Sequence, residues 1–418
     1  MTAPRINLLL NNPFVTDSRS WKIAHSMAGA GWQVTVIGRR GEGLPAREER
    51  EGVTVLRVDQ PAPGWLPSPR LPGGEAELEG RAPGRLTRLA RETGGRAIQA
   101  LRFGVLARAW SAAVSRQAPD ADAWQAEGLI TLPLALALAR RRGGLAVYDS
   151  RDIGVESSRF ARLPGAWRRL LGWRERRWAH GCDAVITVSE PYAEVLAAGL
   201  GRTVDAIVRN CPMRWTPPDP PPRILHEQLA LDPSDRVVLY LGQVAPGRGV
   251  EELIEAIGLV DRAVLVVAGF GPSYEQCRAI AATAPHADRI HFLPGVPPGE
   301  IPSLTASADV AAVPIQPTTL NHRLTTPTKL FDAIGAGTPV VATDLPGMAP
   351  IVRETGCGEL FEPESAADLG RAIRAILEAP PDRRRQLRDN CLRAADERYN
   401  WETQAEVLLD LYRGLGLG

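Results

Sequence analysis

The stretch LYLGQVAPGRGVEELI, from Leu239 to Ile254, combines a buried-strand pattern, a glycine-rich turn and the start of a helix. The turn holds Gly242, Gly247 and Gly249, which allow the backbone to approach a ligand closely. Arg248 adds a positive charge beside the unpaired N–H groups of the helix start. The stretch therefore predicts a phosphate-binding turn, with an ordinary tight turn and a solvated arginine as the alternative.

The same alternation of strands and helices runs along most of the chain. A proline-rich linker, 213–223, divides it into two halves, and the sequence predicts an N-terminal domain over 1–212, a C-terminal domain over 224–396 and a last helix over 397–418 that packs back on the first domain. We expect an α/β fold of two Rossmann-type parallel-sheet domains that face each other across a cleft. The strands are expected at Ile6–Leu10, Val34–Ile37, Val53–Val58, Ala123–Ala126, Leu145–Tyr148, Ala184–Val188, Ala206–Val208, Val237–Leu241, Val264–Ala268, Ile290–Leu293, Val310–Val313 and Pro339–Ala342.

Length and composition restrict the class of protein. The 418 residues correspond to two or three domains, and 49 basic against 48 acidic residues make dedicated nucleic-acid binding unexpected. Five cysteines without a CxxC spacing indicate neither a disulfide framework nor a zinc site, and a reducing cytoplasm is expected. No apolar run reaches the length of a membrane span. The Pro-, Gly- and Arg-rich segment 60–95 is expected to be a long insertion.

A second segment that could form a binding site is TTPTKLFDAIGAGTPVVAT, residues 325–343. Thr326 is expected to cap a helix with Pro327 at its first position, so that the N–H groups of Thr328 and Lys329 point at an anion. Lys329 is one of only two lysines in the chain. One turn later, the Asp332 carboxylate is placed to accept hydrogen bonds from a vicinal diol such as ribose, with an ion pair to Lys329 as the alternative.

These motifs together resemble the donor-binding domain of the family-4 retaining glycosyltransferases of GT-B fold. The resemblance is clearest over residues 237–361 and extends more weakly over nearly the whole chain. It implies that Arg248 and Lys329 act on the donor diphosphate and that Asp332 binds the donor ribose. Gln243 stands where the family has a second arginine, and Leu324 stands where it usually has a sugar-binding glutamate.

The resemblance also implies the remaining donor contacts. The segment Pro327-Thr328-Lys329 matches a Pro-x-Lys pattern found in a subset of these enzymes. By the same resemblance, the backbone of Val296 contacts the base and Gly271 lines the cleft.

The N-terminal half departs further from the family. Its first loop carries Asp17, Arg19 and Lys22, which form a candidate acceptor site or an ordinary surface loop. In the segments that resemble the family's acceptor side, histidines are replaced. The replacing or neighbouring residues are Gln125, Glu127, Arg151 and Asp152, and we expect these groups not to act as bases near neutral pH.

Two further patterns are expected to be structural. Asp120 and Asp122 precede their strand, so no metal site is expected there. Residues 166–178, AWRRLLGWRERRW, are basic and aromatic, and a solvated helix is favoured over a membrane-surface helix.

The sequence thus predicts a bacterial, cytoplasmic, retaining and metal-independent glycosyltransferase without a cofactor, whose co-substrate is a UDP- or GDP-linked sugar and whose acceptor is a small molecule, as in natural-product or antibiotic biosynthesis. Transfer to a glycolipid or cell-wall acceptor, a sugar-nucleotide epimerase and an inert nucleotide-binding homologue are the alternatives. The base, sugar, acceptor, type of glycosidic bond and oligomeric state are not specified by the sequence.

Overall fold

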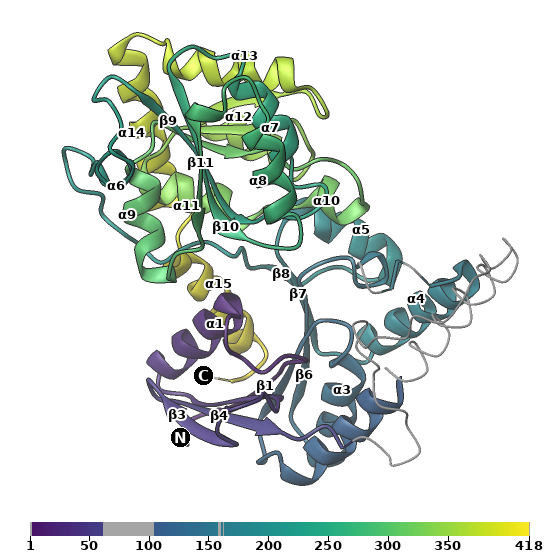
Figure 1. Ribbon diagram of the computed structural model, residues 1–418. Coiled ribbons are helices and arrows are strands. Elements are labelled where there is room, and N and C mark those ends of the chain that lie inside the picture. The colour runs from purple at the N-terminus through teal and green to yellow at the C-terminus, as the bar shows by residue number, and fades with distance from the viewer. Residues whose placement is uncertain (1, 62–103, 158–159, 162, 418) are drawn as a thin grey trace, which may run out of the picture. The chain divides into compact units, whose positions relative to one another are not determined.

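The computed structural model describes residues 2–61, 104–157, 160–161 and 163–417. The predicted insertion at 60–95 lies almost entirely outside the described residues. Two compact units are present, one formed by residues 1–185 with 415–418 and the other by residues 186–414 (Figure 1). The predicted boundaries at 212, 223 and 396 remain predictions.

An eight-stranded sheet forms the centre of the N-terminal half, in the order β3-β4-β2-β1-β5-β6-β7-β8. Its pairs from β4 through β6 are parallel, and β3 joins β4 as an antiparallel edge strand. Because the carboxyl ends of parallel strands share one edge, the loops after β1, β5 and β6 are close together. The strands are β1 (Arg5–Leu9), β2 (Gln33–Arg39), β3 (Arg47–Arg50), β4 (Val53–Val58), β5 (Ala123–Glu127), β6 (Leu145–Ser150), β7 (Ala184–Thr187) and β8 (Ala206–Ile207).

The second sheet is fully parallel and has the order β11-β10-β9-β12-β13-β14. It consists of β9 (Arg236–Gln243), β10 (Ala263–Phe270), β11 (Ile290–Pro294), β12 (Val310–Val313), β13 (Val340–Thr343) and β14 (Gly358–Phe361). Their near-continuous apolar sequences are typical of strands covered by helices on both faces.

The described helices alternate with these strands. In the N-terminal half they are α1 (Ser18–Gly29), residues 104–117, α3 (Leu132–Arg142), η1 (Gly154–Glu156), α4 (Gly165–Ala179) and α5 (Glu190–Leu200). In the C-terminal half they are α6 (Ile224–Leu229), α7 (Val250–Ile257), α8 (Tyr274–Ala282), η2 (Ala287–Arg289), η3 (Pro298–Glu300), α9 (Ile301–Ala306), α10 (Leu320–Leu324), α11 (Thr328–Ala336), α12 (Ala349–Thr355), α13 (Ala366–Leu377), α14 (Pro381–Glu397) and α15 (Trp401–Gly414). None of the helices in the described ranges has the length and apolarity required to cross a bilayer.

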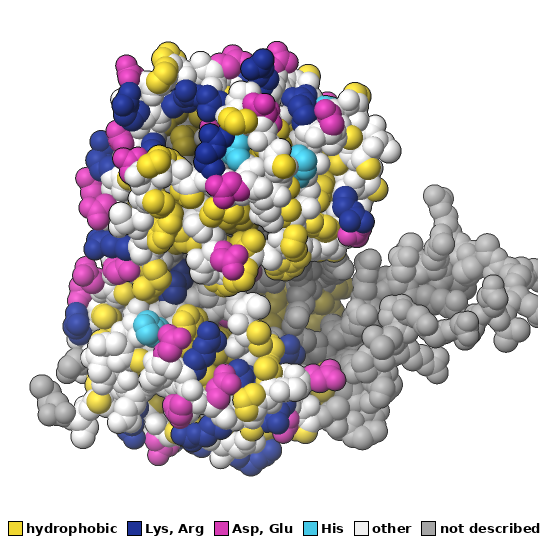
Figure 2. Space-filling model, turned by 60° about the vertical axis from the view of Figure 1, so that its left-hand side comes forward, with side chains coloured by type: hydrophobic (Ala, Val, Ile, Leu, Met, Phe, Trp, Pro, Cys, Tyr) yellow, Lys and Arg dark blue, Asp and Glu magenta, His cyan; other side chains and the backbone are white. Residues whose placement is uncertain are grey.

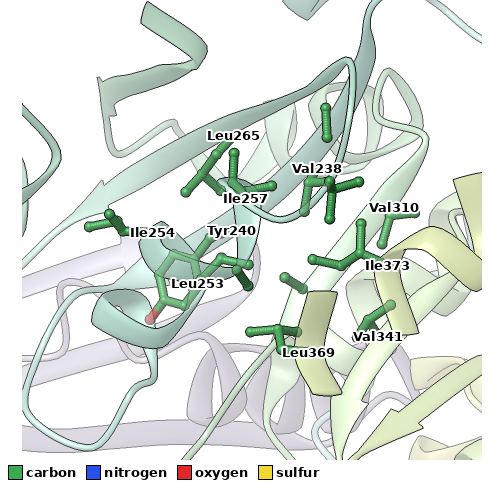
Figure 3. Packing of buried hydrophobic residues seen from close by; sticks show 14 of the residues in the cluster. Val238, Tyr240, Leu253, Ile254, Ile257, Leu265, Val310, Val341, Leu369 and Ile373 are labelled. Atoms are coloured by element: carbon green, nitrogen blue, oxygen red, sulfur yellow. The ribbon is translucent and has the colours of Figure 1, made fainter. Parts of the chain in front are cut away.

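One buried apolar cluster lies between the second sheet and the helices α7 and α13 (Figure 3). Val238 and Tyr240 of β9 contribute to it from the sheet, and Leu253 and Ile373 contribute from the two helices. Burial of these side chains fixes β9 and α7 relative to each other, and with them the glycine turn that joins the two elements.

The expected strands are all present, and none of their ends is shifted by more than two residues. Two strands, β3 and β14, were not expected. Strand β3 has the sequence REER and is mostly exposed, so it lacks the apolar alternation that indicates a strand. Strand β14, with the sequence GELF, is too short for a periodic signal. All five cysteines are free and buried, as expected for a chain without a disulfide framework.

Candidate functional site

The turn after β9 has the close backbone contacts that its glycines predict. Gly249 is the N-cap of α7 with φ 74°, and a Cβ on it would lie 1.7 Å from the carbonyl oxygen of Pro314. Gly247, with φ 75°, would place a Cβ 2.6 Å from Oγ1 of Thr318. No other residue type fits Gly249, because both its conformation and its space exclude a side chain.

The turn after β10 packs directly on the turn after β9. A Cβ on Gly269 would lie 1.9 Å from the carbonyl oxygen of Gly242. Gly271, with φ 146°, would place a Cβ 2.2 Å from the carbonyl oxygen of Val244. The predicted site residue Gly271 therefore belongs to the same strand-end cluster as Gly242.

Lys329 lies over this cluster from the start of α11. Its Nζ is 3.6 Å from the centroid of the Tyr240 ring and 3.7 Å from the position that a Cβ on Gly242 would occupy. The nitrogen is shielded from solvent, and no described residue accepts a hydrogen bond from it. A buried ammonium group that faces an aromatic ring and has no hydrogen-bond acceptor among the described residues keeps the capacity to bind an anion.

The charges around Lys329 agree with that geometry. Burial and the nearby guanidinium of Arg248 hold the pKa of Lys329 well below its usual range, and the carboxylate of Asp332 opposes them. The structure thus brings together three predicted donor residues, Arg248, Lys329 and Asp332, beside Gly242. Two cations against one carboxylate make this cluster attractive to an anion.

The expected cap of α11 was wrong by one residue. Pro327, with ψ 146°, is the N-cap, and Thr328 and Lys329 are the first two helical residues. The Oγ1 of Thr326 is buried and has no hydrogen-bond partner among the described residues. The extended ψ of Pro327 starts the helix after the proline, so the Thr326 hydroxyl lies too far back to cap it.

Sequence reasoning missed His322 of α10, which lies beside the glycine turn. Its Nδ1 is 2.7 Å from Oγ1 of Thr318 and 3.0 Å from the position that a Cβ on Gly247 would occupy. Burial and Arg248 lower the pKa of His322, so the ring is favoured in its neutral form. The six histidines show no ligand spacing in the sequence, and only the packing of α10 against the turn reveals this contact.

The other donor-side predictions occupy different surroundings. Gln243 is exposed at the end of β9, and its carbonyl oxygen accepts a hydrogen bond of 2.6 Å from the Tyr240 hydroxyl. Val296 follows β11 and packs partly buried against an apolar cluster. Leu324 is buried, so this position contributes to the core.

In the first unit, Arg151 is the centre of a half-buried charge network. Its Nη1 lies 2.9 Å from both carboxylate oxygens of Asp17, and its Nη2 donates hydrogen bonds to Glu127 and to the Ser20 hydroxyl. Burial opposes the charge of Arg151, but the carboxylates of Glu127, Asp17 and Asp149 outweigh it and raise its pKa. The network joins the N-terminus of α1 to the ends of β5 and β6.

Arg19 and Gln125 belong to the same network. Arg19 forms a bidentate ion pair with Asp149, with nitrogen–oxygen distances of 2.9 and 3.1 Å. The side chain of Arg19 is 3% exposed and that of Asp149 is 0% exposed. The Nε2 of Gln125 donates a 2.6 Å hydrogen bond to Oε1 of Glu127. The interpretation of Asp17 and Arg19 as an ordinary surface loop is wrong, since Asp17 caps α1 and Arg19 is buried.

Glu127 departs from the expectation that this side holds no base near neutral pH. Burial raises its pKa to about 7, although Arg151 acts in the opposite direction. The carboxyl group therefore changes its protonation near neutral pH while it remains hydrogen-bonded to Arg151 and Gln125.

A second buried acid lies next to this network. Glu175 of α4 accepts a 2.7 Å hydrogen bond from the Tyr148 hydroxyl, and burial raises its pKa to about 7. Burial also raises the pKa of Asp152, whose carbonyl oxygen accepts a 2.9 Å hydrogen bond from Ser150. Lys22 lies in the second turn of α1.

The aspartates at 120 and 122 are engaged with arginines. Asp122 pairs with Arg5 at 2.8 Å, and Asp120 lies 3.5 Å from Arg142. In the part of the chain that the structure describes, no group of three or more histidine, cysteine or acidic side chains is arranged to hold a metal ion.

Two family models match the chain. "Glycosyl transferase 4-like domain" matches residues 17–211, and "Glycosyl transferases group 1" matches residues 223–393. The two regions leave unmatched only the ends and the proline-rich linker. The first region contains the strands β2 to β8, and the second contains all six strands of the second sheet.

Curated relatives agree with these models. A D-inositol 3-phosphate glycosyltransferase of Segniliparus rotundus is 31% identical over 44% of this chain and 41% of its own length, so the match spans less than half of that relative. A GDP-mannose-dependent alpha-(1-6)-phosphatidylinositol monomannoside mannosyltransferase of Mycobacterium tuberculosis is 29% identical over 61% of this chain and 71% of its own length.

The fold agrees as well. Sucrose-phosphate synthase from Thermosynechococcus elongatus superimposes with a TM-score of 0.72 at 19% identity, covering 99% of each chain. The two family models, the two parallel sheets and the fold match lead to one assignment. The chain belongs to the family-4 glycosyltransferases of GT-B fold.

Proposed function

We propose that this protein is a retaining, metal-independent glycosyltransferase of the cytoplasm that moves a sugar from a UDP- or GDP-linked donor to a small-molecule acceptor, as in natural-product biosynthesis. The observation that carries the proposal is the Lys329 ammonium, which is buried beside Arg248 at a glycine turn and lacks a hydrogen-bond acceptor among the described residues. A nucleoside diphosphate supplies the missing negative charge.

The reaction needs charge stabilisation more than it needs a strong base. The bond between the sugar C1 and the diphosphate oxygen breaks, a bond from C1 to the acceptor oxygen forms, and the acceptor proton passes to the departing phosphate. Negative charge on the leaving diphosphate would be stabilised by Arg248, Lys329 and the N–H groups that begin α7 and α11. Retention follows from the resemblance to the family and implies attack from the face that the diphosphate leaves.

The remaining donor residues position the nucleotide. Asp332 would accept hydrogen bonds from the ribose hydroxyls, and the backbone of Val296 would contact the base. Gly242, Gln243 and Gly271 would line the donor site, and Pro327 and Thr328 would present the N–H groups of α11. On this proposal residues 224–396 bind the donor, residues 1–212 bind the acceptor, and residues 213–223 connect them.

The acceptor side would be formed by the network around Arg151. Asp17 and Asp152, together with Lys22 of α1, are the residues that we propose to contact the acceptor. Arg19 and Gln125 are almost fully buried, so we assign them the positioning of Asp149 and Glu127. Glu127 also carries a proton near neutral pH and makes the charge of this side sensitive to pH.

A glycolipid acceptor is the second candidate. The names of the two relatives specify an inositol phosphate and a phosphatidylinositol mannoside. Both acceptors bear a phosphate, and Lys22 is the cation among the proposed acceptor contacts that suits a phosphate.

Thermal unfolding with UDP, GDP, ADP and dTDP, each with and without EDTA, tests the donor site. A ligand at about 100 times its Kd stabilises the folded state by about 2.7 kcal/mol, which is readily detected. We expect one nucleotide to raise the midpoint equally with and without EDTA, and the rise to be smaller in Lys329→Met, which loses one of the two cations at the site. Stabilisation that requires a divalent cation contradicts metal independence, and the absence of any shift contradicts the donor site.

Product analysis then tests the reaction. With the nucleotide identified, nuclear magnetic resonance of the product made from the matching donor should show the anomeric configuration of the donor. An inverted product contradicts retention. A changed sugar nucleotide without any acceptor would indicate an epimerase instead.

A further inference from the structure

Helix α4 carries a row of large apolar side chains on its exposed face. Trp167, Leu170 and Trp173 are 62%, 42% and 55% exposed. Their spacing of three residues places them along one side of the helix. Two tryptophans and a leucine on one exposed helix face form an apolar surface that a water-facing helix does not require.

The opposite face of α4 is the one that packs on the protein. Glu175 and Ala179 are its buried residues, and the helix contacts α3 and η1 (Figure 1). The hydrogen bond between Glu175 and Tyr148 fixes this orientation. The tryptophan row therefore points away from the packed face of its own unit.

The charge on the exposed part of α4 has a single sign. The only acidic residue of the helix, Glu175, is buried, and Arg168 pairs with Glu156 at 3.3 Å. The exposed arginines are Arg169, Arg174, Arg176 and Arg177. On the face of the molecule drawn in Figure 2, by contrast, basic and acidic side chains are interspersed, and the whole chain has a net charge of +1.

The end of α4 continues the same chemistry, because Arg176, Arg177 and His180 are exposed close to the exposed Trp173. The Arg177 guanidinium lies 5.9 Å from the centroid of the Trp173 ring. Arginines beside an indole ring suit the phosphate groups and the interfacial layer of a lipid headgroup region.

From these features we infer that α4 docks on a bilayer that contains anionic lipids. The tryptophans and the leucine enter the interface between headgroups and acyl chains, and the arginines contact the lipid phosphates. The sequence pattern of this segment by itself favours a solvated helix. The exposure of both tryptophans and the burial of the only acid reverse that preference, and the inference does not depend on the transferase activity.

Co-sedimentation with vesicles tests the inference on the full chain, without donor or acceptor. We expect binding to vesicles of phosphatidylcholine with phosphatidylglycerol and little binding to phosphatidylcholine alone. Binding should weaken near 1 M salt, where the Debye length is about 3 Å. Failure to bind the anionic vesicles at low salt overturns the inference.

Variants locate the binding surface. Trp167→Ala with Trp173→Ala should lower the partition coefficient more than about tenfold, while Leu259→Ala with Ile280→Ala, at apolar positions 49% and 39% exposed in the second unit, should leave it unchanged. Equal loss in both double variants, or no loss in the first, contradicts the assignment to α4.

A charge variant separates lipid docking from other anions. Arg169→Gln with Arg174→Gln removes two exposed side chains and should weaken vesicle binding roughly fivefold per arginine. Unchanged circular dichroism and thermal midpoint confirm that each variant is folded. If the protein binds heparin equally with and without the two tryptophans and does not bind vesicles, the surface recognises a soluble polyanion and the inference is wrong.

Discussion

The Lys329 ammonium lies 3.6 Å from the centroid of the Tyr240 ring, and no described residue accepts a hydrogen bond from it. The Tyr240 hydroxyl points the other way, to the carbonyl oxygen of Gln243 at 2.6 Å. The ring therefore presents its face to the lysine from a fixed position. An aromatic face attracts a cation but does not replace a charged partner, so the ammonium retains its capacity to bind an anion.

Nucleotide binding should take up protons. Burial and Arg248 lower the pKa of Lys329, so above that lowered pKa part of the protein holds the lysine neutral. A bound diphosphate favours the charged form and raises the pKa, which draws a proton from solution. Calorimetry of the stabilising nucleotide in buffers of different ionisation enthalpy should show this uptake, and Lys329→Met should abolish it. Equal proton uptake in the variant would assign the proton to another group.

Arg248→Ala should slow turnover by about 10²–10³ if the arginine acts as an electrostatic donor to the leaving diphosphate. The loss should fall on kcat/KM for the donor, and Arg248→Lys should recover part of it because a charge remains. Exposed Arg278→Ala on α8, which pairs only with exposed Glu275 in the described structure, serves as the control. A rate for Arg248→Ala within a few-fold of the control would remove Arg248 from the catalytic residues.

Gly249→Ala should lower the free energy of unfolding of the second unit by far more than the backbone strain of a left-handed alanine alone. Gly249 and Gly43 have nearly equal φ angles, 74° and 71°, but a Cβ on Gly249 would overlap Pro314 whereas one on Gly43 meets nothing within 4 Å. Gly43→Ala should therefore cost about 1–2 kcal/mol, the strain of a left-handed alanine. Gly249→Ala should cost several times more and abolish nucleotide binding. Equal shifts of the two urea midpoints would show that the turn can move aside.

The sequence was sufficient for the elements whose signals are local. The strand before Gly242 and the helix after Gly249 follow from apolar periodicity and from glycine chemistry, and both are present. The pairing of Arg19 with Asp149 joins residues 130 positions apart, so no local pattern indicates it. The pKa of Glu127 depends on the burial produced by that packing, and the position of His322 depends on where α10 meets the turn.

Two buried acids should make stability fall as pH rises. Burial raises the pKa values of Glu127 and Glu175 from 4.5 to about 7. Between these values the unfolded chain releases protons that the folded protein keeps, so the free energy of unfolding decreases with pH. Glu127→Gln and Glu175→Gln should each flatten the decline of the urea midpoint between pH 4.5 and 7, whereas Glu42→Gln, at an exposed position, should not. A decline that is equally steep in all three variants would contradict the raised pKa values.

The buried pair of Arg19 and Asp149 should be costly to break and less costly to remove. Asp149→Ala removes the bidentate partner of the Arg19 guanidinium, which is only 3% exposed. Breaking such a buried pair lowers the free energy of unfolding by about 3–5 kcal/mol. Arg19→Met with Asp149→Ala removes both charges, so its loss should be smaller than the sum of the single losses. The exposed pair of Arg385 and Asp382 is the control, because its disruption should cost under about 1 kcal/mol. Urea unfolding of the two single variants, the double variant and the control measures the coupling. Additive losses would mean that Arg19 and Asp149 stabilise the first unit independently. In that case the Asp149 carboxylate would not be the group that positions Arg19 in the network around Arg151.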